Sequence, residues 1–409
     1  MQMVIMKLKR NSEGDKMNKL IYMDNAATTF VDKNVLDAMI PYLSDKCFNP
    51  SSIYDGAQAV HDALDKARKT IADTLNANSN EIYFTACGTE SDNWALKGVA
   101  HANINKGKHL ITSKIEHHAI LHSMDALSKE GFNITYLPVD KDGLVNPDDL
   151  EKAITSETTL VSIMFANNEI GTIEPIKELG AICKKHGVYF HVDAVQAYAH
   201  TPIDVNDMNI DLLSASGHKF NAMKGTGFLY IRKDVKINNF MDGGGQENRR
   251  RAGTENVAGI IGMAKATELA HAELDERMAH EKELRDYIIG RLTTEIPYSK
   301  LNGHKDKRLT NNVNIGFEFI EGESMLLALN DIGVCASSGS ACTSGSLDPS
   351  HVLLAIGLPH EKAHGSLRLT VSHTTSMEEA KYVCDNLVGI VERLRKMSPL
   401  YEDFVKNKV

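Results

Sequence analysis

An aspartate and a lysine, each at the end of an apolar stretch, give the clearest indication of chemistry in this sequence. Asp193 lies in the segment HVDAVQ, and Lys219 ends the segment SGHK. A pyridoxal phosphate (PLP) site requires this pair. The lysine amine forms a Schiff base with the cofactor aldehyde, and the aspartate keeps the pyridine nitrogen protonated. Because most lysines are solvated surface residues, the pair is a weak signal alone, and the flanking motifs must decide.

The motif CGTESDN is a candidate phosphate-binding loop. It follows the strand-like segment EIYF and opens a helical stretch, so backbone amides and the Thr89 hydroxyl can hold a phosphate at a helix N-terminus. Gly88 permits close approach of the backbone. The alternative is an ordinary helix start, with Thr89 as the N-cap and Asp92 in a loose capping box. Ser216 and His218, beside the lysine, offer further donors to the same dianion.

Three more side chains are placed to contact the ring of such a cofactor. His117 follows a strand-like segment, where an imidazole can stack on a flat ring and exchange protons near neutral pH. Asn168, in NNEIG, and Gln196 can bond the phenolic oxygen and favour its ionised form, although NNEIG alone fits an Asn-rich turn equally well. His118 and His122 lie four residues apart, but no third metal ligand is evident, so no metal site is predicted.

One cysteine has the surroundings of a nucleophile. Cys342 lies in SSGSACTSGS, a run of small polar residues whose composition predicts a mobile loop without a core. Nothing apolar is near to bury this thiol, whereas Cys335, in the apolar GVCAS, is expected to be structural. An exposed thiol on a flexible loop fits a nucleophile that reaches first a substrate and then a partner.

Alternating apolar runs and helical patterns predict the elements that position these residues. The strand candidates are EIYF, HLIT, ITYL, LVSIM, VYFHV, DLLSA and GFLYI. They predict an α/β fold with a mainly parallel seven-stranded sheet, and the candidate site residues fall beyond the carboxyl ends of its strands. After a long helical connector at about 256–294, NVNIGF, GVCAS and SLRLTVS alternate with helices at about 322–330, 350–356 and 377–395 and predict a smaller α/β lobe.

The predicted domain organisation has three parts. Residues 1–16 are expected to be a mobile extension or the product of an upstream start, because Met17 precedes the motif-bearing segment. Residues 17–260 form the large PLP-binding domain, whose N-terminal segment is able to pack on the small domain. Residues 261–409 contain the connector helix and the small C-terminal domain with the Cys342 loop.

Composition excludes several classes of protein. With 42% hydrophobic and 24% charged residues among 409, the chain is neither disordered nor fibrous. A net charge of -9 argues against a broad nucleic-acid surface. No apolar run reaches the roughly 18 residues of a membrane span, and the N-terminus lacks a secretory signal. Six cysteines without a CxxC pair fit a reducing cytosol better than a disulfide framework, so a cytoplasmic protein is predicted.

Together these motifs resemble the cysteine desulfurases of the NifS/IscS group, within the class V aminotransferase-like, fold-type I PLP enzymes. The resemblance spans about Tyr22 to Leu400 and includes DNAATT, NPSS, GGGQE, RAGTEN and SSGSACTSGSLDPSHVL. The loop that carries Cys342 is long and is similar to the loop of the NifS/IscS group. The branch to which many selenocysteine lyases belong has a shorter loop. The resemblance implies removal of sulfur from L-cysteine, giving L-alanine and a Cys342 persulfide that passes to an acceptor for iron–sulfur cluster assembly or related sulfur transfer.

The resemblance also implies a role for each site residue. Lys219 would hold PLP, Asp193 would pair with its pyridine nitrogen, and His117 would stack on the ring. Arg368 would grip the substrate carboxylate, for which a guanidinium is well shaped. The other implied contacts are Gly88, Thr89, Ser216 and His218 at the phosphate, Thr254 from a second subunit at the same phosphate, and Asn168 and Gln196 at the phenolic oxygen, with Asn168 also at the substrate.

The implied partners are L-cysteine, a second copy of the chain and an iron–sulfur scaffold or other sulfur acceptor, with no nucleic acid and no membrane. The shared phosphate site implies the homodimer. No resident metal is implied, although Cys342 could contact an iron–sulfur cluster transiently during transfer.

Three departures from the family pattern leave every catalytic group intact. Cys87 stands where serine or glycine is common, Phe48 precedes NPSS where glycine is usual, and His373 lies in a variable stretch after Arg368. A selenocysteine lyase or a class V aminotransferase is the alternative on the same fold. Transamination needs no thiol, so the cysteine loop argues against it. The complete set of catalytic residues argues against a non-catalytic sulfur-transfer scaffold.

Overall fold

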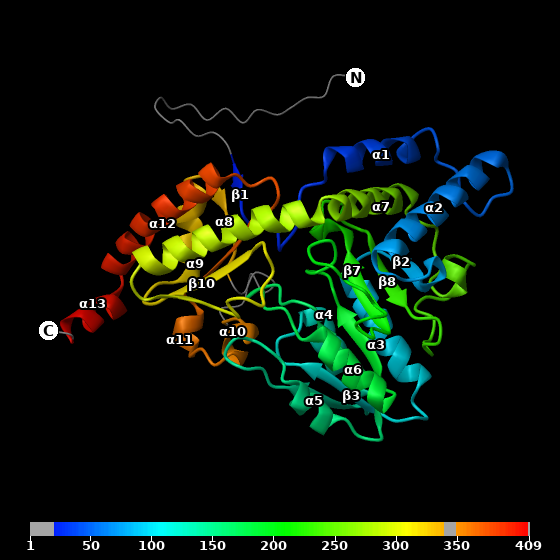
Figure 1. The fold of residues 1–409 in the computed structure, drawn as a ribbon, viewed down its shortest axis with the longest axis horizontal. Coiled ribbons are helices and arrows are strands. Elements are labelled where there is room, and N and C mark those ends of the chain that lie inside the picture. The colour runs from blue at the N-terminus through cyan, green and yellow to red at the C-terminus, as the bar shows by residue number, and fades with distance from the viewer. Residues whose placement is uncertain (1–19, 339–348, 408–409) are drawn as a thin grey trace.

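The computed structural model describes residues 20–338 and 349–407, which form a large and a small lobe (Figure 1). The large lobe contains a seven-stranded sheet with the spatial order β2-β8-β7-β6-β5-β3-β4. Its strands are β2 (Ile82–Thr85), β3 (His109–Ser113), β4 (Asn133–Leu137), β5 (Thr158–Met164), β6 (Tyr189–Asp193), β7 (Leu212–Ser216) and β8 (Gly227–Ile231). Strand β8 runs antiparallel to both of its neighbours, β2 and β7, and the other pairs of neighbouring strands in this sheet are parallel. The predicted mainly parallel sheet of seven strands is therefore confirmed.

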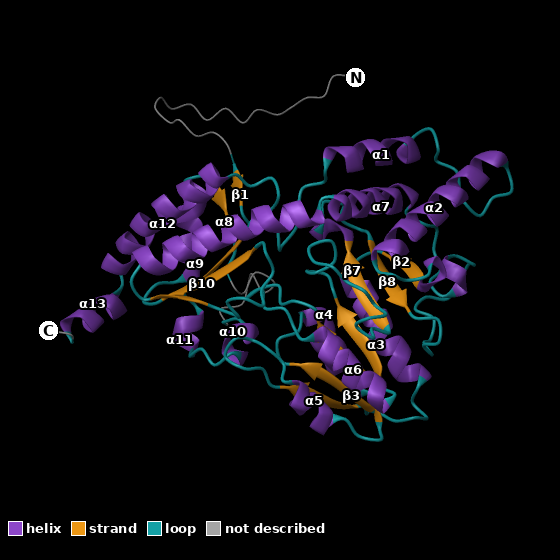
Figure 2. Ribbon diagram, viewed as in Figure 1, coloured by secondary structure: helices purple, strands orange, loops and turns teal. Residues whose placement is uncertain are grey.

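Helices cover both faces of the large sheet (Figure 2). Strands β3, β5, β7 and β8 are buried along their whole length, which explains why each reads as a continuous apolar run. The helices of this lobe are α1 (Lys33–Leu43), α2 (Asp55–Thr74), α3 (Gly88–Ala102), α4 (His118–Lys129), α5 (Pro147–Ala153), α6 (Ile176–His186) and α7 (Val257–Ala272). Helices α1 and α2 pack against α7 at one side of the lobe.

The small lobe is built on a three-stranded antiparallel sheet with the order β12-β10-β9. Its elements are α8 (Leu274–Glu295), β9 (Ser299–Leu301), β10 (Asn312–Phe317), α9 (Gly322–Asp331), α10 (His351–Ala355), α11 (His360–Ala363), β12 (Ser366–Thr370), α12 (Met377–Lys396) and α13 (Pro399–Lys406). The predicted strand GVCAS is shortened to β11 (Val334–Cys335), which pairs with β1 (Ile21–Tyr22) and not with this sheet. Ile21 and Met23 accordingly join the small-lobe core.

The predicted continuous connector is two helices. Helix α7 ends at Ala272 and α8 begins at Leu274, because Glu273 leaves helical geometry with φ -116° and ψ 14°. Buried residues of α7 belong to the large-lobe core, whereas those of α8 belong to the small-lobe core. The boundary predicted between residues 260 and 261 falls inside α7, and the division into domains stays a prediction.

None of the helices within residues 20–338 and 349–407 combines the length and apolar character needed to cross a membrane.

Candidate active site

Ten residues predicted from sequence line one cavity of about 330 Å³, and all of them except Arg368 belong to the large lobe. They are Gly88, Thr89, His117, Asn168, Asp193, Gln196, Ser216, His218, Lys219 and Arg368. Thr254 lines a different, smaller cavity. Cys342 lies outside the described residues. The structure thus brings most of the predicted set together within one chain.

The lysine and the aspartate approach the cavity from neighbouring parallel strands. Asp193 ends β6, and Lys219 lies in the short 3₁₀ turn that follows β7. The carboxyl ends of parallel strands meet at one edge of a sheet, so both side chains reach the same space. Lys219 Nζ donates to the carbonyl oxygens of Ala26 at 2.6 Å and Ala27 at 2.9 Å. The N-terminal segment therefore holds the amine, a role that sequence analysis missed.

Asp193 is an acid held in a buried position. Its side chain lies at the cavity wall in a residue only 5% exposed, and Oδ1 accepts the Val195 amide at 2.9 Å. Burial raises the pKa of Asp193 to about 6, while the Val195 amide and the Lys219 charge act in the opposite direction. A cationic group placed against Asp193 would favour the ionised form further.

The start of α3 fits a phosphate group. A Cβ at Gly88 would come within 2.6 Å of Val195 Cγ2, so only glycine leaves this approach open. The N-cap of α3 is Cys87, without a side-chain capping bond, so the alternative of a Thr89 cap is wrong. The Ser216 hydroxyl is buried and has no hydrogen-bond partner in the described protein. A buried unpaired donor beside a helix N-terminus is what an anion would satisfy.

His218 completes this end of the cavity. Its Nδ1 lies 3.1 Å from Thr28 Oγ1. Burial, followed by the charges of Lys219 and Lys224, lowers the pKa of His218 to about 4. The ring is therefore neutral near pH 7, when it can donate one hydrogen bond from one nitrogen.

His117 is fixed in a single orientation as the N-cap of α4. Its Nδ1 accepts the Ala119 amide at 3.1 Å, so the proton of the neutral ring lies on Nε2. Burial, followed by the charge of Lys219, lowers the pKa of His117 to about 4. Near pH 7 this imidazole is neutral.

Arg368 on β12 extends from the small lobe into the cavity and is only 2% exposed. Nη2 donates to Asp24 Oδ1 at 3.0 Å, and Nη1 donates to the carbonyl oxygen of Asn168 at 2.9 Å. Nε is buried without a partner in the described protein. The guanidinium is thus oriented by two contacts and keeps a donor for a ligand. Asp24, in DNAATT, is a second functional residue that sequence analysis did not identify.

Gln196 and Asn168 line the cavity as predicted, and the residue after Asn168 adds an unexpected acid. Gln196 Nε2 donates to the Ala26 carbonyl at 3.0 Å. Glu169 is buried and accepts a short hydrogen bond from Ser350, the N-cap of α10. Burial raises the pKa of Glu169 to about 7, opposed by the Ser350 bond and the charge of Arg368. The start of α10 is therefore tied to the edge of the site.

A histidine cluster lies beside the cavity. The His118 ring stacks on His122, with centroids 5.0 Å apart, and lies 4.8 Å from the ring of His351. His351 is a third imidazole that sequence spacing did not reveal. Within the described ranges, however, no three His, Cys, Asp or Glu residues are arranged to hold a metal ion.

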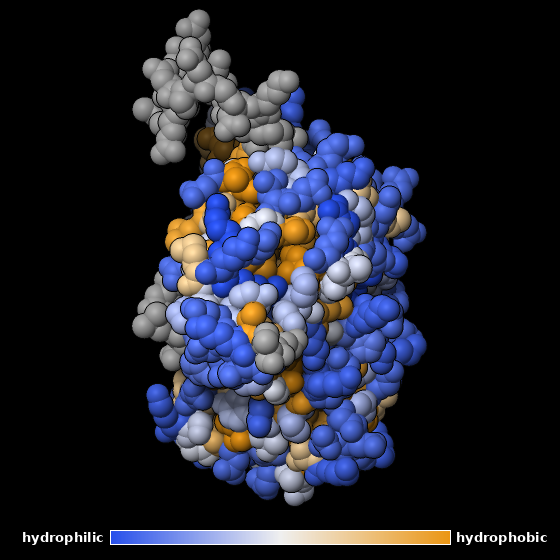
Figure 3. Space-filling model, turned by 90° about the vertical axis from the view of Figure 1, so that its left-hand side faces the viewer, coloured by the Kyte–Doolittle hydropathy of each residue, from blue (hydrophilic) through white to orange (hydrophobic). Residues whose placement is uncertain are grey.

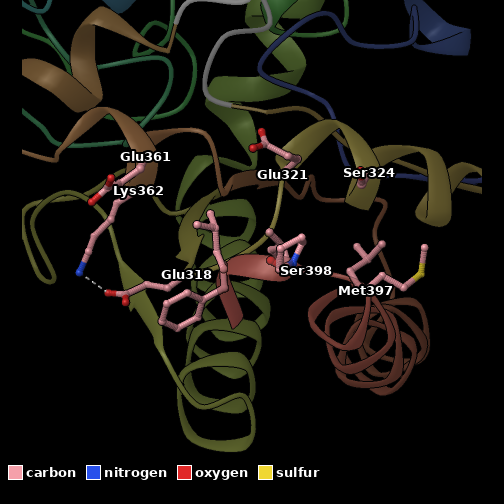
Figure 4. Close-up of a pocket in the computed structure, with 12 residues that line it drawn as sticks. Glu318, Glu321, Ser324, Glu361, Lys362, Met397 and Ser398 are labelled. Atoms are coloured by element: carbon pink, nitrogen blue, oxygen red, sulfur yellow. Dashed lines mark hydrogen bonds and ion pairs between the residues drawn. The ribbon is translucent and has the colours of Figure 1, made fainter. Parts of the chain in front are cut away.

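A larger cavity of about 550 Å³ lies in the small lobe. Glu318, Glu321 and Glu361 line it, and Glu318 Oε1 pairs with Lys362 Nζ at 2.6 Å (Figure 4). On the small-lobe side of the molecule, hydrophobic residues gather in patches among hydrophilic ones (Figure 3). None of the ten predicted residues lines this second cavity.

The fold and the first cavity define a class: an α/β enzyme with a lysine-centred site beyond the carboxyl edge of a mainly parallel sheet. The family model "Aminotransferase class-V" matches residues 21–383, so the chain belongs to the class V aminotransferase family. Enzymes of this family are generally PLP-dependent.

Individual proteins within this family are similar to the chain over nearly its full length. The chain is 58% identical to "Cysteine desulfurase IscS" of Methanosarcina thermophila over 393 residues, which cover 95% of this chain and 97% of that protein. A solved "NIFS-like protein" is similar with a TM-score of 0.87 at 37% identity, covering 92% of this chain and all of the other. The solved structure "SspA in complex with cysteine" has a TM-score of 0.77 at 37% identity, covering 87% and 100%.

Proposed function

We propose that this chain is a PLP-dependent cysteine desulfurase that converts L-cysteine to L-alanine and leaves a persulfide on Cys342. The observation that carries the proposal is the convergence of Lys219, Asp193 and Arg368 on one buried cavity. The names of the relatives support the same reaction, and one similar structure was solved with cysteine.

The described residues suit PLP at each end of the cofactor. The amides at the start of α3 and the unpaired Ser216 hydroxyl would hold its phosphate, and Asp193 would lie at its ring nitrogen. When bound, the cofactor supplies an electron sink for the charge that develops on the substrate Cα. Lys219 would hold it covalently.

Three side chains would handle the substrate. Arg368 would bind the carboxylate through its unpaired Nε, because Asp24 and the Asn168 carbonyl already fix the guanidinium plane. The Lys219 amine would remove the Cα proton. The neutral His117 ring would accept the proton of the Cys342 thiol, because only a thiolate is a competent nucleophile.

Sulfur transfer then balances without an external oxidant. The substrate Cβ–S bond breaks while an S–S bond forms on Cys342, and Cβ gains a proton to become the methyl group of alanine. The transferred sulfur is oxidised and the carbon is reduced by the same two electrons. The persulfide sulfur would pass to an acceptor protein for iron–sulfur cluster assembly or related sulfur transfer.

We further propose a cytoplasmic homodimer. Thr254 lies outside the site cavity of its own chain, which suits a threonine that completes the phosphate site of a second copy. The five cysteines within the described ranges are all free thiols, as expected in a reducing compartment.

Mass spectrometry of the Cys342 peptide after addition of L-cysteine tests the reaction, with alanine measured in the same sample. A mass increase of one sulfur on that peptide, together with formation of alanine, is expected.

The matched control is Cys342→Ala, which should keep the visible absorption band of the bound cofactor and form no persulfide. Full release of sulfide by this variant in the presence of dithiothreitol would contradict the assignment of Cys342.

A further inference from the structure

A second carboxyl group lies beneath the cavity beside Asp193. Asp92 is on α3, which packs against β6 and β7, and the residue is only 1% exposed. Its side chain reaches the cavity wall, yet Oδ1 has no hydrogen-bond partner in the described protein. An ionised carboxylate in such a place is costly, because the side chain is removed from bulk solvent and none of the causes acting on its pKa is a cation.

The groups around Asp92 form a buried polar chain. His191 Nε2 lies 2.9 Å from Ser214 Oγ, and His191 Nδ1 lies 2.8 Å from Ser162 Oγ. Ser214 lies close enough to Asp92 to lower the pKa of its carboxyl group, against the effect of burial. His191 Nε2 is 3.8 Å from Asp92 Oδ1, which is too long for a hydrogen bond. His191, Ser162 and Ser214 are all buried, so this polar group beside Asp92 is shielded from solvent.

His191 does not supply a positive charge to neutralise Asp92. The imidazole is fully buried, and burial lowers its pKa to about 3. Each ring nitrogen lies at hydrogen-bond distance from a serine hydroxyl. Because a hydroxyl can donate or accept, the two serines satisfy the one donor and the one acceptor of a neutral imidazole. Asp92 therefore has no cationic partner among these contacts.

The acids around Asp92 favour its neutral form. Burial, followed by the charge of Asp193, raises the pKa of Asp92 well above its ordinary value, opposed by the Ser214 bond; Glu116 adds a smaller increase. Asp193 differs because it accepts the Val195 amide and is stabilised by Lys219. Of two adjacent buried carboxyls, the one with donors and a cation takes the negative charge.

We propose that Asp92 is a positioning residue that permanently carries a proton and thereby confines the negative charge under the cofactor ring to Asp193. The proposal rests on the proposed PLP function. A neutral Asp92 prevents a second charge next to Asp193, so that one carboxylate, with one orientation, would face the ring nitrogen.

Infrared spectroscopy detects the proton directly. At a pH where an exposed aspartate is fully ionised, the difference spectrum between the unsubstituted protein and Asp92→Asn should contain the carbonyl stretch of a protonated carboxylic acid. In Asp193→Asn the same band should titrate at lower pH, because the neighbouring negative charge is gone. An unchanged titration of this band in Asp193→Asn would show that the two carboxyl groups are not coupled and would contradict the proposal.

Cofactor affinity gives the second readout. Asparagine is a neutral isostere of a protonated aspartate, so Asp92→Asn should change the PLP dissociation constant by less than about threefold and leave the visible band in place. The matched control is Glu281→Gln, which removes a buried acid of the other lobe that bonds Thr310 and should leave both the Asp92 band and the PLP affinity unchanged.

Loss of PLP affinity by tenfold or more in folded Asp92→Asn, or the absence of the protonated carboxyl band, would overturn the proposal. Should Asp92→Asn not fold, isotope-labelled aspartate in the unsubstituted protein and in Asp193→Asn gives the same titration. Failure of the unsubstituted protein to bind PLP would refute the proposed function instead, while the infrared band would still report the proton on Asp92.

Discussion

The candidate active-site cavity and the small-lobe cavity differ in what lines them rather than in size alone. The small-lobe cavity, about 550 Å³, is the larger, but its lysine is paired with Glu318. The active-site cavity, about 330 Å³, contains a buried carboxylate, a buried guanidinium with an unpaired donor and an unpaired hydroxyl. Unpaired buried polar groups are costly unless a ligand satisfies them. The buried polar groups without partners, and not the volume, therefore distinguish the candidate active site from the small-lobe cavity.

The largest effect should come from Lys219 in the candidate active site, with Lys362 in the small-lobe cavity as its control. Lys219→Ala removes the proposed cofactor attachment and the base, so desulfurase activity should fall by at least about 10³-fold and the visible PLP band should disappear. Lys362→Ala, in the small-lobe cavity, should leave the band and the rate unchanged. Absorbance spectra and alanine formation measure both. Equal losses in the two variants would erase the distinction between the cavities.

Replacement of two buried arginines, Arg368 and Arg395, should separate substrate binding from stability. Arg368→Lys loses the planar contact with Asp24 and the Asn168 carbonyl, so kcat/KM for L-cysteine should fall about 10- to 100-fold, mainly through KM. Arg395→Lys loses backbone contacts in the small lobe and should lower thermal stability without changing KM. An unchanged KM in Arg368→Lys would remove this residue from the substrate site.

The buried His117 should couple pH to stability. Its folded pKa of about 4 lies below the unfolded value of about 6.5, so the unfolded chain binds a proton first as pH falls. The free energy of unfolding should therefore decrease between about pH 6.5 and pH 4. Denaturant titrations of His117→Asn should give a shallower decrease, by about 1 kcal/mol per pH unit. The surface variant His101→Gln serves as the control, and a slope equally reduced there would contradict the assignment.

The smallest effect on the candidate site should come from Cys87, with the buried Cys384 as the comparison. Cys87→Ser places a favourable capping residue at the start of α3, so PLP affinity should stay within about twofold and stability should rise slightly. Cys384→Ser buries a hydroxyl among apolar side chains and should cost about 1–3 kcal/mol without affecting PLP. Thermal melts and PLP titrations measure both. A loss of PLP in Cys87→Ser would show that the thiol itself contributes to the phosphate site.

The strands of the large lobe could be predicted from the sequence, because a buried parallel strand is a nearly continuous run of apolar residues. All seven strand candidates became strands of one sheet. The strand pairing of the small lobe was harder to predict from the sequence. GVCAS resembles a strand of the local sheet, but its partner is Ile21 and Tyr22 near the other end of the chain, and pairing at that separation leaves no local pattern. The break at Glu273 was equally hidden, since an apolar helical pattern runs through it.

In the site, sequence analysis found residues with distinctive side chains and missed those that act through the backbone or through burial. The carbonyls of Ala26 and Ala27 hold Lys219, yet a carbonyl has no sequence signature. Asp92 was interpreted as part of a helix cap because only the packing of α3 on the sheet reveals that its carboxyl is buried. Charge and spacing can be read from sequence, whereas desolvation requires a structure.

The pairing of the N-terminal segment also determines when the site can form during synthesis. Asn25 Nδ2 donates to the carbonyl oxygen of Thr370, 345 positions further along the chain. At a ribosomal rate of about 5–20 residues per second, this partner emerges roughly 20 to 70 s later. Arg368 lies two positions before Thr370, so the part of the candidate site that the small lobe contributes can join only when translation is nearly finished. The large sheet, with Asp193 and Lys219, can fold earlier.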